Sequence, residues 1–474
     1  MKVLLVRVPI QPCEVMKQVT FSYFAEPVGL HYLAEALDAV GMESRIHDMF
    51  LDADPDSFMA VVSGDRPDVV GFSSLILGYD NVRLLAGLVK ARFPEAVVVV
   101  GGPCTFMPPR VLMERGSAID YLIKGEGEES FPRLCRVIAG SKQEGLADID
   151  ALTWRDGRRI VENPRRRFVD PGAISYPLDR YRDYNDAMAG SIMTVMMGEP
   201  PIAFIEASRG CPFSCSFCGV HEPYRTRPPE KVVEEMGELY RRHGVRKFVF
   251  GDYTLTADQG HAELLCRLII QSGLPVEWGC DTRVDCVTPQ LLKLMKRAGC
   301  RVIFYGVESF HDQTLTLYNK GTDAATIKKA LRDTRRAGIR TLAYMMLGGP
   351  GESREMIRDN SATLNSLGVD YALAGITRLF CGTALFEQAV ERGVIDRRQG
   401  EDCCLSGLID WIPVWEERLG YAELKELEAE VVKSFYYRPG YVWQRLRGVR
   451  DGAELWRMTR VLARFTAGRF SRTC

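Results

Sequence analysis

Three cysteines, Cys211, Cys215 and Cys218, stand four and three residues apart, directly after a stretch that reads as a β-strand. One short loop can therefore bring all three thiols to a metal cluster. Three thiolates leave one iron of a [4Fe–4S] cluster without a protein ligand, and chelation of a substrate requires such an open position. Zinc is the alternative, but a closed structural zinc site needs a fourth Cys or His, and His221 is the only near candidate.

This motif resembles the signature of the radical S-adenosylmethionine superfamily, which is CxxxCxxC with an aromatic residue before the last cysteine, here Phe217. The resemblance covers residues 200–385. It implies that the free iron binds the amino and carboxylate groups of S-adenosylmethionine, and that one-electron reduction cleaves this molecule to methionine and a 5′-deoxyadenosyl radical. Cys211, Cys215 and Cys218 are then both the metal ligands and the catalytic residues.

Other positions of the same family fall after the following predicted strands. Asp252 stands where the family often has Gly-Gly-Glu, and the resemblance implies a hydrogen bond from the methionine amino group. Arg283 is expected to pair with a carboxylate, because its planar fork suits bidentate contact. Glu308 corresponds to the ribose acceptor, and Gly348 and Gly349 allow close approach of backbone to the nucleoside. For each polar residue, an ordinary loop or helix-cap role is the alternative.

The first 140 residues resemble the cobalamin-binding domain that precedes many radical S-adenosylmethionine cores. The resemblance begins at the segment Glu26–His31 and continues through three small or polar loops after predicted strands. The implied cofactor-binding residues are Ser73, Ser74, Leu75, Gly101, Gly102, Gly125, Glu126 and Gly127. The glycines have a steric reason, because backbone must approach a bulky tetrapyrrole or its nucleotide tail.

One departure concerns the cobalt ligand. The Asp-x-His-x-x-Gly motif that supplies a lower axial histidine in cobalamin mutases is absent after the first strand, and His47 follows the second strand. A Rossmann-like domain that binds nothing, or a docking module for a partner, is therefore an alternative. Methylthiotransferases are a further one, but they place three cluster cysteines in this domain, and Cys13, Cys104 and Cys135 have the wrong spacing.

Short apolar stretches and helical stretches alternate along most of the chain, which predicts an α/β fold. Residues 1–140 are expected to form a doubly wound Rossmann-like domain, and 141–200 a linker with a small hairpin at 151–162. Residues 201–390 contain six βα units, which predicts a partial (β/α)6 TIM-like barrel rather than the eight units of a closed one. Residues 391–474 are expected to be helical. The strands are predicted at 3–8, 44–49, 69–73, 97–100, 121–124, 203–206, 248–250, 276–278, 302–305, 342–346 and 371–376.

Composition narrows the class of partner. The chain of 474 residues has 61 basic and 62 acidic residues, so no overall field attracts nucleic acid. Its 14 scattered cysteines fit a reducing compartment, which favours the cytoplasm. No apolar run is long enough to span a bilayer. The basic amphipathic segment 455–472 is expected to pack on the barrel, with contact to an anionic membrane surface as the alternative.

These features together predict a cobalamin-dependent radical S-adenosylmethionine enzyme with a [4Fe–4S] cluster, S-adenosylmethionine and cobalamin as cofactors. The resemblance implies a methyltransferase acting on an unactivated carbon of a small molecule, through a 5′-deoxyadenosyl radical and methylcobalamin. It also implies an external one-electron reductant of the flavodoxin or ferredoxin type. Oxidative cyclisation, hydroxylation and radical rearrangement with the same cofactors are the alternatives. Residues 435–441 loosely resemble hopanoid methylases and the anaerobic magnesium-protoporphyrin cyclase, which points to a lipid or tetrapyrrole substrate.

Overall fold

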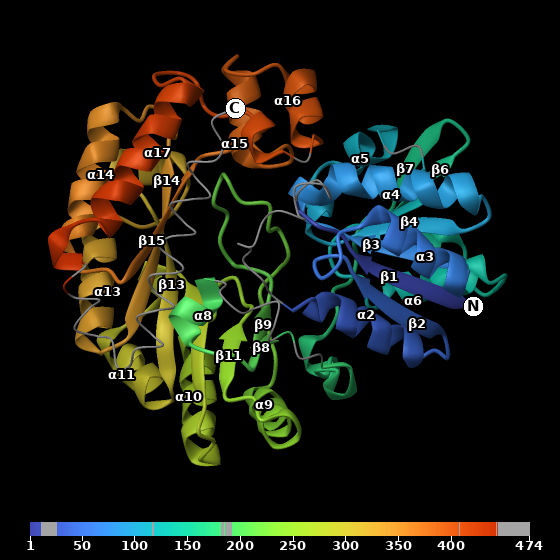
Figure 1. The fold of residues 1–474 in the computed structure, drawn as a ribbon, viewed down its shortest axis with the longest axis horizontal. Coiled ribbons are helices and arrows are strands. Elements are labelled where there is room, and N and C mark those ends of the chain that lie inside the picture. The colour runs from blue at the N-terminus through green and yellow to red at the C-terminus, as the bar shows by residue number, and fades with distance from the viewer. Residues whose placement is uncertain are drawn as a thin grey trace.

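Two sheets with helices packed on their faces stand side by side in the computed structural model (Figure 1). The structure describes residues 1–10, 26–115, 118–181, 184, 192–406, 408–441 and 443. The first sheet contains seven strands in the order β2-β1-β3-β4-β5-β6-β7, and the second contains six in the order β15-β14-β13-β12-β11-β8. The predicted α/β class is confirmed.

The first five strands of the first sheet are parallel. The Val, Leu and Ile content of β1, β3, β4 and β5 fits strands that are covered on both faces, whereas β2 at the edge is mostly polar. Helices α3, α4 and α5 lie on one face and helices α2 and α6 on the other, which confirms the doubly wound arrangement. The bounds are β1 Lys2–Arg7, α2 Val28–Asp38, β2 Glu43–Asp48, α3 Pro55–Asp65, β3 Val69–Ser73, α4 Tyr79–Arg92, β4 Val97–Gly101, α5 Pro109–Arg115, β5 Tyr121–Ile123 and α6 Ser130–Ile138.

The predicted hairpin consists of β6 (Leu152–Asp156) and β7 (Arg159–Glu162), with Gly157 at a positive φ of 60° in the turn. Strand β6 pairs antiparallel with β5, so the hairpin is the edge of the first sheet. The sheet of the first domain thus continues beyond residue 140.

The six strands of the second sheet are all parallel and follow one another in chain order, as predicted for a partial barrel. The short helix α8 (Ile192–Met197) packs against β12 and β13. The bounds are β8 Ile202–Ile205, α9 Pro229–His243, β11 Lys247–Phe250, α10 Gln259–Ser272, β12 Glu277–Thr282, α11 Pro289–Arg297, β13 Cys300–Glu308, α12 Asp312–Leu317, α13 Ala324–Arg336, β14 Arg340–Leu347, α14 Arg354–Ser366 and β15 Tyr371–Ile376.

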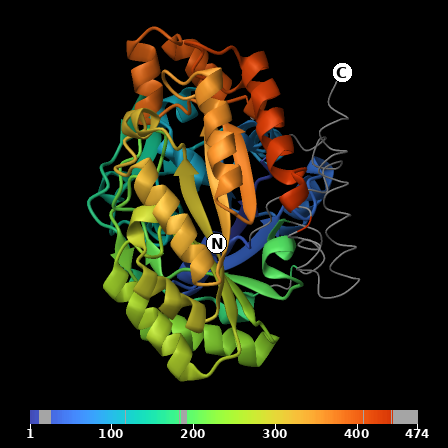
Figure 2. The same ribbon diagram turned by 90° about the vertical axis from the view of Figure 1, so that its left-hand side faces the viewer.

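The chain after the second sheet is helical, as predicted, with α15 (Ala384–Glu391), α16 (Arg397–Cys404) and α17 (Tyr421–Tyr436). Helix α17 lies against α14 and β15 and completes the helical layer on this side of the barrel (Figure 2). The predicted amphipathic segment 455–472 lies outside the described residues. Among the described helices, none is long and apolar enough to cross a membrane.

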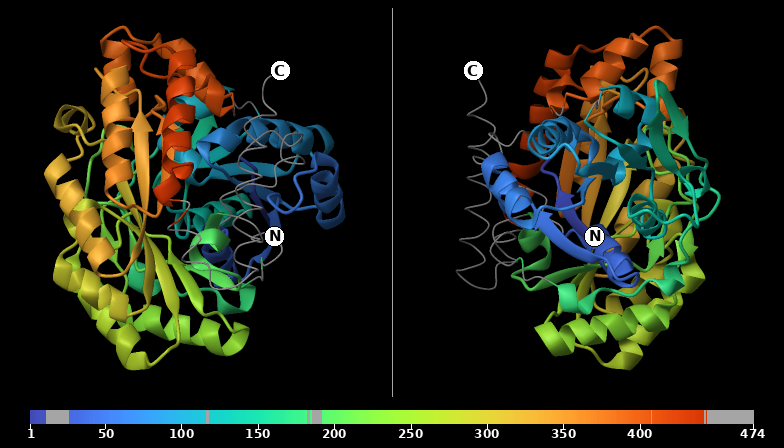
Figure 3. Two further views of the ribbon diagram at one scale, coloured as in Figure 1. Left: turned by 60° about the vertical axis from the view of Figure 1, so that its left-hand side comes forward. Right: turned by 90° about the vertical axis from the view of Figure 1, so that its right-hand side faces the viewer.

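Two apolar clusters join the domains. One contains Met107, which follows β4, together with Tyr318 and Leu379 of the second domain. The other contains Val28 and Tyr32 at the start of α2, packed with residues of the barrel. The carboxyl edge of the first sheet therefore faces the barrel, and the two sheets remain adjacent in the turned views (Figure 3).

Candidate cluster and cofactor site

The three cysteines lie in a loop that starts after β8 and is closed by a two-stranded ribbon. Strand β9 (Ser208–Arg209) pairs antiparallel with β10 (Arg225–Thr226), and the backbone N–H of Cys211 donates to the Glu222 carbonyl over 3.2 Å. Gly210 has a positive φ of 74°, and a Cβ there would clash with the Pro223 carbonyl. The sequence therefore forms a narrow neck that gathers the thiols into one loop.

Each of the three sulfurs has a polar neighbour. Thr254 Oγ1 lies 3.7 Å from Cys211 Sγ, and Arg283 Nη1 donates to Cys215 Sγ over 3.5 Å. The backbone N–H of Val220 donates to Cys218 Sγ, also over 3.5 Å. Donors aimed at sulfur favour thiolates and tune the clusters that thiolates hold. The surroundings of this loop therefore fit an iron–sulfur cluster.

Burial raises the pKa of the Cys215 thiol, and the charges of Lys320 and Arg283 act against that rise. Burial also raises the pKa of Cys218, while the Val220 N–H lowers it. All three thiols are half-buried, whereas most other described cysteines are buried. The loop thus holds thiols that are accessible to iron but largely shielded from water.

Nothing in the described part of the chain supports the zinc alternative. Within it, no three His, Cys, Asp or Glu side chains gather closely enough to hold one metal ion, and His221 is exposed. Cysteines around a four-iron cluster bind different irons, so they need not converge on one point.

Phe217 packs edge-to-face on Tyr318, with ring centroids 5.3 Å apart, and the ammonium of Lys320 lies 5.8 Å from its centroid. The aromatic residue of the motif thus anchors the loop on the segment after β13.

Arg283 follows β12, and its guanidinium forms several contacts within the protein. Its Nε and Nη2 donate to Asp285 over 2.9 and 2.6 Å, and Nη2 also donates to the Lys320 carbonyl. The guanidinium carbon lies 3.8 Å from the centroid of the Phe213 ring. The expected bidentate pairing with a carboxylate of the substrate stays a prediction, because the Nε and Nη2 groups bind the carboxylate of Asp285 in this structure.

Asp252 is buried, and its carboxylate accepts from the Ala207 N–H over 3.0 Å and from the Ser208 hydroxyl. Burial raises the pKa of Asp252 to about 7, against the lowering effect of these hydrogen bonds. In this structure the carboxylate holds the start of the cysteine loop, and its predicted contact with an amino group remains a proposal.

Glu308 ends β13 with a positive φ of 62°, and its carboxylate forms a buried ion pair with Lys320 over 2.8 Å. A Cβ on Gly306 would lie 2.5 Å from this carboxylate, so glycine is required beside it. The Lys320 partner has no local sequence signal, and the sequence did not predict it.

Gly348 and Gly349 both donate their N–H groups to Glu352 Oε2, over 2.7 and 3.2 Å. A Cβ on Gly349 would overlap the Tyr318 hydroxyl, and one on Gly348 would lie 2.7 Å from Leu424. The atoms that closely approach these two glycines therefore belong to other side chains of the protein, Tyr318 and Leu424. Contact with a nucleoside stays a prediction.

In the first domain, the loops after β3 and β4 touch each other. Gly102 has a φ of 83°, and a Cβ there would lie 2.6 Å from Ser73 Oγ. The Ser74 hydroxyl donates to the Leu75 carbonyl over 2.7 Å and is buried, whereas the Leu75 side chain is 45% exposed. Leu75 thus offers an apolar surface at the carboxyl edge, which suits a macrocycle. Contact of Ser74 with a cofactor stays a prediction.

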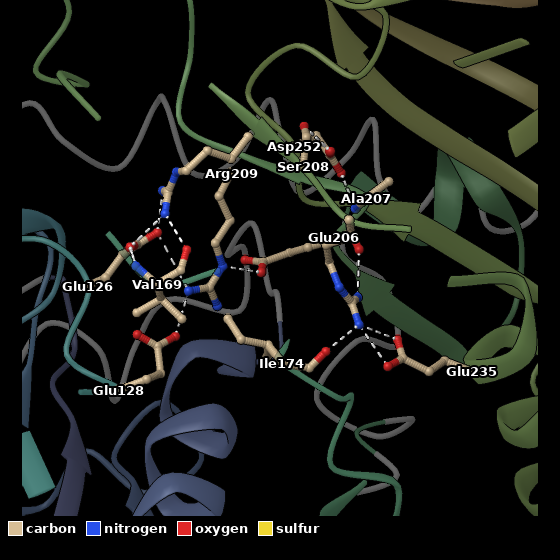
Figure 4. A network of polar contacts seen from close by, with 12 residues as sticks. Glu126, Glu128, Val169, Ile174, Glu206, Ala207, Ser208, Arg209, Glu235 and Asp252 are labelled. Atoms are coloured by element: carbon tan, nitrogen blue, oxygen red, sulfur yellow. Dashed lines mark hydrogen bonds and ion pairs between the residues drawn. The ribbon is translucent and has the colours of Figure 1, made fainter. Parts of the chain in front are cut away.

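The loop after β5 contacts the β9–β10 ribbon that closes the cysteine loop. Glu126 accepts from Arg225 over 2.5 and 3.0 Å, and its Oε1 lies 3.6 Å from Arg209 (Figure 4). A Cβ on Gly125 would lie 2.9 Å from the Glu222 carboxylate, and one on Gly127 would lie 3.0 Å from Leu33. Burial raises the pKa of Glu126, but the hydrogen bond and the charges of the arginines prevail and lower it.

Phe106 contacts Gly219 and Gly382, and the sequence did not predict these contacts. A Cβ on Gly219 would lie 2.6 Å from the Phe106 ring, and one on Gly382 would lie 2.8 Å from the Phe106 carbonyl. The turn after β4 thus abuts the residue next to Cys218.

The remaining candidates lie elsewhere. His47 is on β2, at the edge of the first sheet opposite the β6–β7 hairpin. Cys104 and Cys135 are buried in apolar clusters on opposite faces of the first sheet, so they do not lie at one cluster. Cys13 lies outside the described residues.

Comparison with protein families gives two matches, to the Radical SAM superfamily over residues 205–362 and to the B12 binding domain over residues 18–135. An uncharacterized methyltransferase of Pyrococcus horikoshii is 26% identical, with 83% of this chain and 85% of the relative covered. The anaerobic magnesium-protoporphyrin IX monomethyl ester cyclase of Cereibacter sphaeroides is 32% identical over 62% of this chain and 48% of the cyclase. Hopanoid C-3 methylase of Methylococcus capsulatus is 28% identical over 70% of this chain and 62% of the methylase. The chain therefore spans about half the length of the cyclase and less than two thirds of that of the methylase.

Two solved structures share the fold. The radical S-adenosylmethionine methyltransferase TsrM from Kitasatospora setae has a TM-score of 0.69 at 22% identity, with 82% of this chain and 76% of TsrM covered. The cobalamin-dependent S-adenosylmethionine radical enzyme OxsB has a TM-score of 0.72 at 15% identity, with 99% of this chain and 71% of OxsB covered.

Proposed function

Because this chain belongs to the radical SAM superfamily and carries a B12 binding domain, we propose that it transfers a methyl group to an unactivated carbon of a small molecule. The Radical SAM match implies a [4Fe–4S] cluster and S-adenosylmethionine, and the B12 binding match implies cobalamin. The B12 binding match supports cobalamin as a cofactor over the alternative that the first domain is only a docking module.

One observation carries the proposal: the carboxyl edge of the B12 binding domain lies against the cysteine loop. The Phe106 ring packs against Gly219, and Glu126 accepts a hydrogen bond from Arg225. An sp³ C–H bond has no acidity for a polar mechanism to exploit, so its methylation requires a radical, and cofactors supply that chemistry. When bound, they provide a 5′-deoxyadenosyl radical on one side of the substrate and a methyl group on the other. Juxtaposition of the two binding regions is what such a reaction needs.

We assign the cluster to Cys211, Cys215 and Cys218. The chain's own groups support this assignment, because the Arg283 guanidinium and the Val220 N–H donate to the sulfurs. Both donors favour the thiolate form that iron requires. Glu308 and the segment after β14 are the proposed nucleoside side, and Ser73, Leu75, Gly101 and Gly102 the proposed cobalamin side.

The substrate that we propose is a small molecule. We further infer a one-electron reductant of the flavodoxin or ferredoxin type. The reducing cytoplasm is the compartment that suits this chemistry, and the twelve cysteines of the described residues are free. By their names, the relatives act on a hopanoid and on a protoporphyrin ester, so a polycyclic or tetrapyrrole substrate is our candidate class.

The test uses the anaerobically reconstituted protein with S-adenosylmethionine labelled in its methyl group and a strong reductant. A methyltransferase produces both S-adenosylhomocysteine and 5′-deoxyadenosine. A cyclase, hydroxylase or rearrangement enzyme produces no S-adenosylhomocysteine, whether or not it releases 5′-deoxyadenosine. The triple Cys211→Ala, Cys215→Ala, Cys218→Ala variant should release no deoxyadenosine. Release of deoxyadenosine without any S-adenosylhomocysteine would exclude methyl transfer and favour oxidative cyclisation, the reaction in the name of one relative.

A further inference from the structure

The ribbon that closes the cysteine loop contains an unfavourable pair. Arg209 and Arg225 lie directly opposite each other on β9 and β10. Like charges at directly opposite positions of an antiparallel pair repel and destabilise it. The ribbon has only two residues in each strand, so its own backbone hydrogen bonds are few. Something outside the ribbon must offset this repulsion.

The compensating charge comes from the first domain. Glu126, just after β5, accepts from Arg225 Nη1 and Nη2 over 3.0 and 2.5 Å, and lies 3.6 Å from Arg209. Figure 4 shows Glu126 and Glu128 reaching Arg209 from the first domain, while Glu206 contacts it from the segment between β8 and β9. Arg209 therefore has three carboxylates, but among the described residues Glu126 is the only carboxylate paired with Arg225.

Glu126 is held firmly in this place. Its Oε2 also accepts from the Val169 N–H over 3.1 Å, and Arg225 Nη1 donates to the Val169 carbonyl over 2.6 Å. The Arg225 guanidinium lies 4.9 Å from the centroid of Phe168. The side chains of Glu126 and Arg225 are only 11% and 18% exposed, so water screens the pair weakly. A bidentate pair in such a setting fixes geometry as well as charge.

We propose that Glu126 is a positioning residue, which fixes the cysteine loop and its cluster to the carboxyl edge of the B12 binding domain. This inference rests on the proposed assignment of the cluster to Cys211, Cys215 and Cys218. Glu126 acts through Arg225 and Arg209, which brace the two strands of the neck. In this way the domain that binds one cofactor holds the loop that binds the other.

The test compares the full-length wild-type protein with Glu126→Gln, after anaerobic reconstitution with iron and sulfide. Iron per chain, the electron paramagnetic resonance spectrum of the reduced cluster, and retained cobalamin are measured. Glu126→Gln should hold at least threefold less iron, or a cluster with an altered spectrum, while it retains cobalamin. Glu144→Gln is the matched control, because Glu144 pairs with Arg133 within the first domain and should behave as wild type.

Charge exchange provides the second measurement. Arg225→Glu alone should lose iron, because the new carboxylate meets Glu126. The double variant Glu126→Arg, Arg225→Glu restores opposite charges across the domain boundary and also places a carboxylate opposite Arg209, so it should recover at least half of the wild-type iron. If Glu126→Gln does not fold, Arg225→Gln tests the same pair from the other side.

Two results would overturn this role of Glu126: wild-type iron and spectrum in Glu126→Gln, or no recovery in the double variant beyond either single variant. A wild-type protein that takes up no cluster would count against the proposed function itself.

Discussion

The guanidinium of Arg283 donates from Nη1 to the sulfur of Cys215 over 3.5 Å. The same group stacks on Phe213 and pairs with Asp285, so its position is fixed from three sides. A buried positive charge beside a ligand sulfur stabilises the more negative, reduced state of a cluster.

Arg283→Gln should make the cluster harder to reduce, because it removes the positive charge and the fixed donor. We expect about tenfold less reduced cluster at a fixed potential, equivalent to about 59 mV for a one-electron couple. A redox titration followed by paramagnetic resonance measures this shift. Arg297→Gln, an exposed position at the end of α11, is the control and should leave the potential unchanged.

Gly219→Ala should disturb the contact between the first domain and the cysteine loop. The added Cβ would lie 2.6 Å from the Phe106 ring, and overpacking of this kind costs about 1–3 kcal/mol. We expect a lower midpoint of thermal unfolding and less bound iron, and Phe106→Ala in the same chain should relieve both. Gly87→Ala in α4 meets no atom within 4 Å and should be neutral or slightly stabilising. Equal midpoints for both alanine variants would mean that the contact is not tight.

Lys320→Met should be strongly destabilising, because it leaves the buried carboxylate of Glu308 without its partner. Breaking a buried ion pair from one side costs about 3–5 kcal/mol. Lys329→Met is the matched control, since Lys329 pairs with Asp333 on the surface and its loss should change the free energy of unfolding by less than about 0.5 kcal/mol. Denaturant unfolding of the three proteins measures the difference. A similar small change for both variants would contradict a structural role of the buried pair.

The stability of the protein should depend on pH through Glu352. Burial raises its pKa from an ordinary value of 4.5 to about 7, against the lowering effect of the Gly349, Gly348 and Asn360 donors. The folded state therefore binds a proton more tightly than the unfolded state. The resulting stabilisation is complete below pH 4.5 and is lost as the pH rises toward 7, by about 3 kcal/mol at about 1.4 kcal/mol per pKa unit.

Glu352→Gln mimics the protonated group and should abolish this part of the pH dependence. Thermal unfolding of both proteins between pH 4.5 and 8 should give midpoints that diverge as the pH rises. Parallel curves for the two proteins would contradict the raised pKa.

The strands could be predicted because most of them are short apolar runs between small or polar loops. Strand β12 was predicted to end at Trp278, but it continues to Thr282. Gly279 and Asp281 have low strand propensity, and the pairing of these residues with β13 overrides that preference. Local pattern therefore identified the element and missed its length.

The site could be predicted only where chemistry and sequence spacing coincide, as in the cysteine loop. Cofactor binding by Glu126 stays a prediction, and the pairing of its carboxylate with Arg225, which lies 99 positions away, has no local sequence signal. Lys320 and Phe106 carry no local signal either, because each acts through a contact made by folding. Residue types at a sheet edge indicate that a site is there, whereas their partners depend on how the two domains pack.

The apolar cluster that unites Met107 with Tyr318 and Leu379 means that the two halves are not exchangeable modules. If the chain were divided between residues 181 and 192, each half would expose part of this apolar cluster to water. A recombinant enzyme with a foreign B12 domain would need matching residues at this seam. We therefore expect new substrate specificities to arise by substitutions in the barrel loops rather than by exchange of whole domains.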